Sequence, residues 1–151
     1  MAHYKRIFAA LDGGDTQLMV ARRALSFAHD SNAEVLFAHV IEKTELEMGN
    51  VDIDAILAKS KQTNEEALEN YLASEIHDEH IPSVKVEIRA GAITDTLGQI
   101  AKEFKPDLVV CGVRGLSNIK YAFVGSVSTY LIRHMECDVL VVRPDAEEDA
   151  D

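Results

Sequence analysis

The sequence predicts an α/β fold, a doubly wound parallel sheet of five strands with helices on both faces. Five short apolar or alternating runs have the length and residue types of strands, and segments with helical periodicity separate them. This alternation is typical of parallel sheets, because each crossover connection then carries a helix onto one face of the sheet. The expected strands are residues 5–11, 33–41, 84–89, 107–112 and 138–143, and the expected helices are residues 16–28, 53–77, 97–104 and 126–134.

The strands differ in their patterns of apolar residues. Residues 107–112 form a short apolar run after Pro106, which predicts a central strand covered on both faces. Residues 5–11 are also apolar and stop at a turn sequence, Asp12-Gly13-Gly14-Asp15. Residues 84–89 alternate apolar and charged side chains, so we expect one face to meet solvent or the strand to lie at a sheet edge.

The helices are predicted from apolar residues at helical spacing and from their end signals. The inward stripe expected for the first helix consists of Leu18, Ala21, Leu25 and Ala28, widened by Ala24 and Phe27. Pro82 and Pro106 follow the second and third helices, which they cannot continue, and Ser126 can cap the fourth. Residues 42–50 are polar and without period, so we expect a loop long enough to reach over a ligand.

Length and charge narrow the class of protein. The 151 residues predict one domain, residues 1–144, followed by an acidic and disordered tail, residues 145–151. The net charge of −11 makes nucleic acid and anionic membranes poor partners. The sequence contains no apolar run of membrane-spanning length and no signal-peptide pattern, so we expect a cytoplasmic protein. Cys111 and Cys137 are interpreted as buried thiols, and the six histidines show no strong metal-binding pattern.

The candidate site is a glycine-containing segment after the fourth strand. Two residues separate Gly112 from Gly115, nine separate Gly115 from Gly125, and a helix is expected to begin at Ser126. Glycines let a backbone approach a ligand closely, and a helix start offers unpaired N–H groups and the positive end of a dipole. Phosphate is the ligand that such a segment suits best.

This spacing resembles the nucleotide loop of the ATP-binding branch of the universal stress protein family: glycine, two residues, glycine, nine residues, Gly-Ser. The Asp12-Gly13 turn and the pair His39-Val40 at the end of the second strand are similar to further positions of that family. The resemblance extends from Lys5 to Arg143. It implies a Rossmann-like sheet with strand order 3-2-1-4-5, and a ligand beyond the carboxyl ends of the first and fourth strands, where the winding reverses.

The resemblance also implies a set of nucleotide contacts. Asp12 and the backbone of Val40 would meet adenine and Gly112 the ribose. The phosphates would be held by Gly115, Gly125, Ser126, Val127 and Ser128. The full expected set is Leu11, Asp12, Val40, Gly112, Arg114, Gly115, Gly125, Ser126, Val127 and Ser128. The chain departs from the family at Gly14, where serine is frequent, and at Arg114, whose guanidinium could pair with phosphate oxygens. The expected ligand is ATP, with ADP or AMP as alternatives and Mg²⁺ as an accompanying ion.

Each site residue also has a purely structural interpretation. Asp12 can simply end its strand, Val40 can belong to the core, and Ser126 can act as a helix N-cap without a ligand. The joint spacing, rather than any single residue, favours a nucleotide site.

Catalysis is not indicated by these residues. The Walker-type Gly-Lys-Ser/Thr is missing and the loop supplies no residue that would activate water, so we expect a nucleotide-dependent regulator with slow or no ATP hydrolysis. The alternatives are a nucleotide-free interaction protein of the same fold, an ATP pyrophosphatase of a related fold, and a receiver-like phosphoacceptor. The pyrophosphatase would need Ser-Gly-Gly-x-Asp-Ser, and residues 12–16 lack its initial serine and one spacer.

Association is expected through the fifth strand. In the order 3-2-1-4-5 this strand is an edge, and its apolar residues Val139 to Val142 invite pairing with a second copy. We therefore expect a homodimer, together with an unidentified protein partner for the regulator. On this interpretation, charges introduced at Leu140 and Val142 would separate the protomers.

Overall fold

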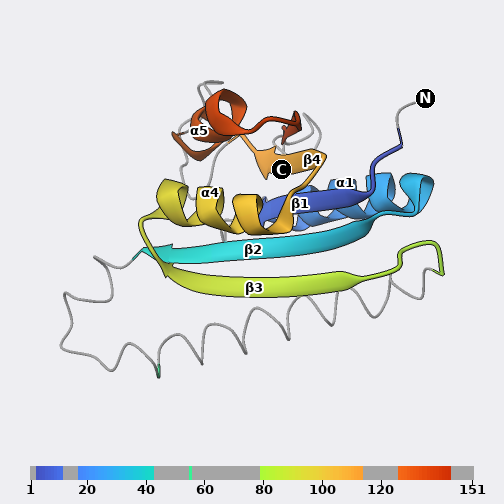
Figure 1. The fold of residues 1–151 in the computed structure, drawn as a ribbon, viewed down its shortest axis with the longest axis horizontal. Helices are drawn as coiled ribbons and strands as arrows, with labels where there is room; N and C mark the ends of the chain where they lie inside the picture. The colour runs from blue at the N-terminus through green and yellow to red at the C-terminus, as the bar shows by residue number, and fades with distance from the viewer. Residues whose placement is uncertain (1–2, 12–16, 43–54, 56–78, 114–125, 144–151) are drawn as a thin grey trace, which may run out of the picture.

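The computed structural model describes residues 3–11, 17–42, 55, 79–113 and 126–143 (Figure 1). Its strands are β1 Arg6–Leu11, β2 Glu34–Glu42, β3 Val84–Gly91, β4 Leu108–Gly112 and β5 Asp138–Val142. Its helices are α1 Gln17–Ser31, α4 Ile93–Phe104 and α5 Ser126–His134. The expected helix at 53–77 apart from residue 55, the loop beyond Glu42 and the acidic tail lie outside these residues.

The five strands form one parallel sheet in the order β3-β2-β1-β4-β5. This order confirms the prediction of a doubly wound sheet, in which the winding reverses between β1 and β4. It also puts β3 at an edge, as the alternation of residues 84–89 indicates. The side chains of Lys85, Glu87 and Arg89 share one face of this edge strand.

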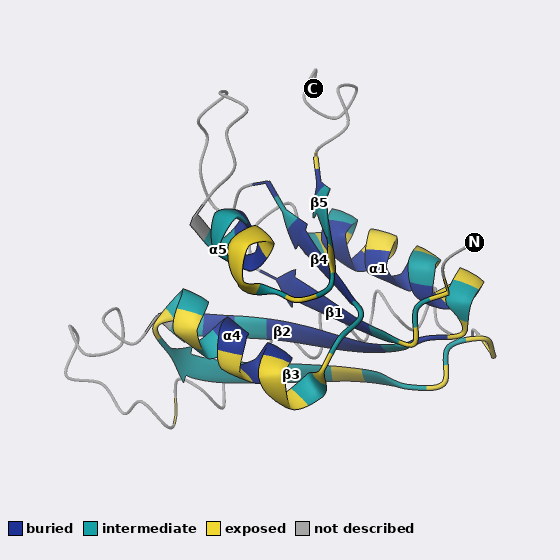
Figure 2. Cartoon of the chain, turned by 45° about the horizontal axis from the view of Figure 1, so that its top comes forward, coloured by how far each residue is buried: buried dark blue, intermediate teal, exposed yellow. Residues whose placement is uncertain are grey.

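The sheet separates two hydrophobic clusters. Ile7, Ala9 and Leu11 of β1 face helix α1, whereas Phe8 and Ala10 face α4 and α5. Buried residues therefore line both sides of the inner strands (Figure 2). Because β1 is covered on both faces, its sequence is a continuous apolar run instead of an alternating one.

Helix α1 corrects part of the predicted stripe. Ala21, Ala24, Leu25 and Ala28 are buried as expected, but Leu18 is 41% exposed. Leu18 lies in the first turn of α1, where Met19 and Val20 pack on the cluster instead. The stripe is completed instead by Val20, which is 2% exposed.

Helix α4 begins four residues before Leu97, the first residue expected in it, and its ends are sharply defined. Gly91 precedes it with a φ of 157°, and a Cβ there would lie 2.5 Å from Thr96 Oγ1, so glycine is required for this entry. At the other end Lys105 adopts the left-handed conformation and its N–H donates to the carbonyl of Ala101. Pro106 follows, as the sequence predicts.

The amino ends of the strands are held by carboxylates. Asp107, just before β4, accepts hydrogen bonds from the backbone N–H groups of Lys5 and Arg6 at 2.8 and 3.0 Å. The Tyr4 hydroxyl donates to Asp138 at 2.8 Å, which raises the pKa of Tyr4. These bonds tie β1, β4 and β5 together at the end of the sheet opposite the expected ligand site. No helix in the described part of the chain is long and apolar enough to cross a membrane.

Candidate functional site

The pairing of β1 with β4 ends before either strand does. The register of these two strands runs from Ile7↔Leu108 to Ala9↔Val110 within the described residues, two residues short of the ends of both strands. By contrast, β1 pairs with β2 up to Leu11, and β4 pairs with β5 up to Gly112. The carboxyl ends of the central strands therefore remain free of each other at the point where the winding reverses, which is the position of ligand sites in open α/β sheets.

Helix α5 begins at Ser126, as the sequence predicts, and lies on the α4 side of the sheet (Figure 1). The first backbone N–H groups of a helix have no partner within it, so the backbone N–H groups of Ser126 and Val127 are candidate donors to an anion. The Ser128 side chain is 1% exposed, and that of Val127 packs on the α4-side cluster. Any phosphate contact by Val127 and Ser128 would therefore be made by their main chain.

The other expected site residues divide into two groups. Leu11, Val40 and Gly112 lie at the carboxyl ends of β1, β2 and β4. Leu11 is 6% and Val40 7% exposed, and the Val40 side chain belongs to the α4-side cluster, so only its backbone is available to a ligand. The remaining site residues lie outside the described part of the chain: Asp12, Arg114, Gly115 and Gly125.

One contact at this end of the sheet was not expected from the sequence. The His39 Nδ1 atom lies 3.0 Å from the carbonyl oxygen of Leu11, which is its register partner across β1 and β2. A carbonyl oxygen only accepts hydrogen bonds, so Nδ1 carries the proton and donates it. The pair His39-Val40 was singled out in the sequence, but this partner becomes visible only once the strand register is known.

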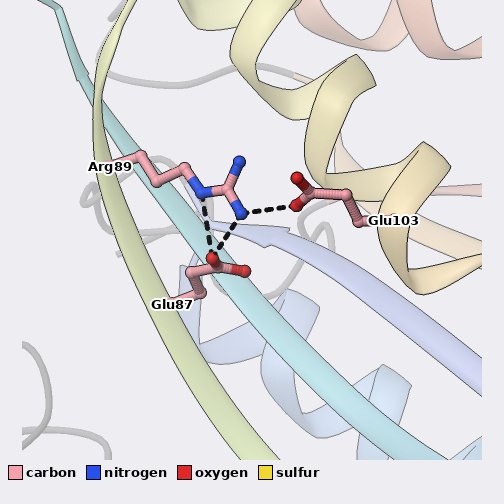
Figure 3. Close-up of polar contacts among 3 residues, drawn as sticks. All are labelled: Glu87, Arg89 and Glu103. Atoms are coloured by element: carbon pink, nitrogen blue, oxygen red, sulfur yellow. Dashed lines mark hydrogen bonds and ion pairs between the residues drawn. The ribbon is translucent and has the colours of Figure 1, made fainter.

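A separate cluster of charges connects β3 to α4 (Figure 3). Arg89 donates to Glu87 Oε1 through Nε at 2.9 Å and Nη2 at 2.6 Å, and to Glu103 Oε2 at 2.5 Å. These two carboxylates, Glu103 foremost, raise the pKa of Arg89. The cluster borders a groove of about 400 Å³ whose other charged pair is Arg6 with Glu34. Of the cations that line this groove, Arg6 and Arg89 already face carboxylates, whereas Lys85 makes no ion pair within the described residues.

Metal binding has little support in the residues that the structure describes. They contain no group of three or more His, Cys, Asp or Glu side chains that could hold a metal ion. Cys111 is buried and Cys137 half-buried, and both are free thiols. Burial raises the pKa of Cys111 to about 12, which disfavours the thiolate that metal binding requires.

The sheet order, with its switch point between β1 and β4, defines a class of protein, the Rossmann-like doubly wound proteins. The chain belongs more narrowly to the universal stress protein family, whose model matches residues 3–143. A Staphylococcus haemolyticus protein named as a universal stress protein is 30% identical over 145 residues, covering 95% of this chain and 87% of its own. A homologue from Staphylococcus aureus strain USA300 is 31% identical over 144 residues, covering 95% and 86%.

Solved structures share the fold. The hypothetical protein MJ0577 superposes with a TM-score of 0.78 at 24% identity, covering 96% of this chain and 99% of its own. The protein UspA from Lactobacillus plantarum has a TM-score of 0.67 at 23% identity, covering 95% and 100%. A universal stress protein crystallised in complex with cAMP has a TM-score of 0.60 at 28% identity, covering 94% and 98%.

Proposed function

We propose that this chain binds an adenine nucleotide, ATP foremost, in the crevice beyond the carboxyl ends of β1 and β4. The observation that carries the proposal is the early end of the β1–β4 register at Ala9↔Val110, because it leaves the ends of both strands free beside a helix start. Crevice, glycine spacing and helix N–H groups together suit a phosphate-bearing ligand.

The choice of adenine rests on the family. A universal stress protein 28% identical to this chain was crystallised with cAMP, a nucleotide with an adenine base. By resemblance, adenine would lie between Asp12 and the Val40 backbone, and the phosphates would meet the segment from Gly115 to Ser128. ATP, ADP and AMP all fit this division of contacts, and Mg²⁺ would accompany a triphosphate.

The anion would be held mainly by neutral donors. The chain carries a net charge of −11, so its overall field opposes a phosphate ligand. Backbone N–H groups at the start of α5 oppose this field locally, and Arg114 would add a bidentate cation. Affinity is therefore expected to rise with ionic strength over the range in which the long-range repulsion is screened.

The proposed role is that of a nucleotide-dependent regulator in the cytoplasm, with slow or no hydrolysis. Nucleotide would order the glycine segment and change which surface a protein partner meets, in a homodimer paired through β5. Rapid multiple-turnover ATP hydrolysis that disappears in Gly115→Ala would contradict the absence of catalysis. A multiple-turnover phosphate-release assay with both proteins makes this comparison.

A second candidate function is a nucleotide-free interaction protein of the same fold. It is favoured by one observation, that the Val40 and Ser128 side chains are buried and thus serve the core whether or not a ligand binds. Mass spectrometry of small molecules released from protein purified without added nucleotide separates the two. Recovered adenine nucleotide in stoichiometric amount excludes the nucleotide-free candidate.

A further inference from the structure

The side chain of His39 joins the two strands that would flank the adenine base. His39 lies near the carboxyl end of β2 and is half-buried. Its side chain lies on the α1 face of the sheet, as does that of its register partner Leu11. Its Nδ1–H donates to the Leu11 carbonyl at 3.0 Å. The bond lies at the carboxyl end of the β1–β2 register, where Leu11 is the last residue of β1.

The hydrogen bond from His39 acts on the last carbonyl group of β1. The Leu11 carbonyl belongs to the peptide unit whose nitrogen is that of residue 12, and peptide units are planar and rigid. A hydrogen bond to this oxygen therefore restrains the orientation of the last carbonyl group of β1. His39 is in turn bonded covalently to Val40, the residue whose backbone is expected on the other side of the base.

We infer that His39 is a positioning residue for the adenine end of the nucleotide site. This inference rests on the proposed function. The imidazole ties the last residue of β1 to β2 directly before Val40, whose backbone is an expected adenine contact. The expected phosphate contacts at the start of α5 follow β4 in the chain, and β4 lies on the other side of β1 from β2, so we expect them not to depend on this bond.

A matched set of substitutions isolates the hydrogen bond from the shape of the ring. His39→Asn keeps an N–H donor the same number of bonds from Cβ as Nδ1 but loses the ring. His39→Phe keeps a ring but has no donor. His39→Gln has an amide N–H one bond further from Cβ, so the donor is out of place for the Leu11 carbonyl. It replaces His39→Phe in the test if the phenylalanine variant does not fold.

The test compares binding of ATP, adenosine and inorganic tripolyphosphate by isothermal titration calorimetry on folded proteins. We expect His39→Phe to weaken ATP and adenosine about tenfold and to leave tripolyphosphate unchanged, and His39→Asn to stay within about threefold of the parent. A purely structural role would instead weaken all three ligands together. That result, or equal adenosine affinity in parent and phenylalanine variant, overturns the inference alone. Absence of ATP and adenosine binding in the parent overturns the proposed function with it.

Discussion

The Tyr130 hydroxyl of α5 lies 2.6 Å from the position that a Cβ would take on Gly98 of α4. The two helices therefore pack closely because residue 98 has no side chain, and Tyr130 fills the space instead. Gly98 is buried in the helix interior, where alanine would otherwise be preferred. Close packing of α4 on α5 thus explains why residue 98 is glycine, which the helical pattern of the sequence does not explain.

Gly98→Ala is expected to destabilise the protein by about 1 kcal/mol, because the cost of displacing Tyr130 exceeds the gain in helix propensity. The contacting atom is the far end of a side chain, so Tyr130→Phe should relieve the clash. The double variant is expected to be at least as stable as the parent. Urea unfolding of both single variants and the double variant measures this coupling, and strictly additive effects would show that the two residues do not interact.

Alkaline pH should weaken the fold through Cys111. Its pKa is raised from 9.0 to about 12 by burial, so the thiol of the unfolded chain ionises first as the pH rises. Stability is therefore unaffected below about pH 9 and is lost between about pH 9 and pH 12. Between about pH 8 and pH 10.5 the parent should lose about 2 kcal/mol more than Cys111→Ala.

Tyr4 and Cys137 have raised pKa values as well, through the Asp138 hydrogen bond and burial respectively, so Cys111→Ala should retain part of the alkaline loss. Cys137→Ala is the matched control, because it keeps the contribution of Cys111. Equal pH dependence of the parent and Cys111→Ala in guanidinium unfolding would contradict this account.

The Arg89 cluster should contribute a small and salt-sensitive stabilisation. Arg89 is 29% exposed and its partners Glu87 and Glu103 are 35% and 54% exposed, so solvent screens their attraction. Arg89→Ala is expected to cost about 1 kcal/mol at low ionic strength and distinctly less in about 1 M salt. Lys85→Ala, on the same face of β3, is the control, since Lys85 makes no ion pair within the described part of the chain. A loss independent of salt would indicate a packing role.

Dimerisation through β5 can be tested at its backbone. The Val142 carbonyl accepts from the N–H of Val113 next to β4, so the alternating N–H of Val141 points toward the free edge. Val141→Pro removes this outward donor and is expected to give monomers, whereas Val141→Ala keeps it and should remain dimeric. Light scattering measures the molar mass of both variants in solution. A folded, dimeric proline variant would show that the interface lies elsewhere.

The same strand shows that charges at Leu140 and Val142 would be a poor test. Val142 is 3% exposed and belongs to the α1-side cluster, against which Leu140 also packs. A charge at Val142 would be buried in the protomer and one at half-buried Leu140 would lie against the same cluster, so either would destabilise the fold itself. The sequence pattern identifies an apolar edge but not which of its groups face outward.

Much of the architecture can be predicted from local patterns. The start of α5 at Ser126 was predicted from a capping residue before a helical stripe. The alternating charges of residues 84–89 predicted a solvent-exposed face or an edge position, and the structure places β3 at an edge. Leu18 was misassigned because periodicity alone does not show how far a helix extends beyond the sheet it covers. The strand order came from family resemblance, since the alternation of elements is the same for several orders.

The candidate site could be predicted less completely. Its glycine spacing is local and visible in the sequence, but the His39–Leu11 hydrogen bond depends on the register of strands 28 residues apart. Likewise, Val40 and Ser128 could be named as contacts, but only their burial shows that the backbone must make them. Nonlocal pairing and burial thus determine which atoms of the expected residues can reach a ligand.

Titration of ATP into the purified protein by isothermal titration calorimetry, with adenosine as competitor, tests the central claim most directly. The proposed site predicts saturable binding of one ATP per chain, lost when adenosine occupies the crevice. A folded protein that shows no saturable binding at millimolar ATP would contradict a nucleotide site between β1 and β4.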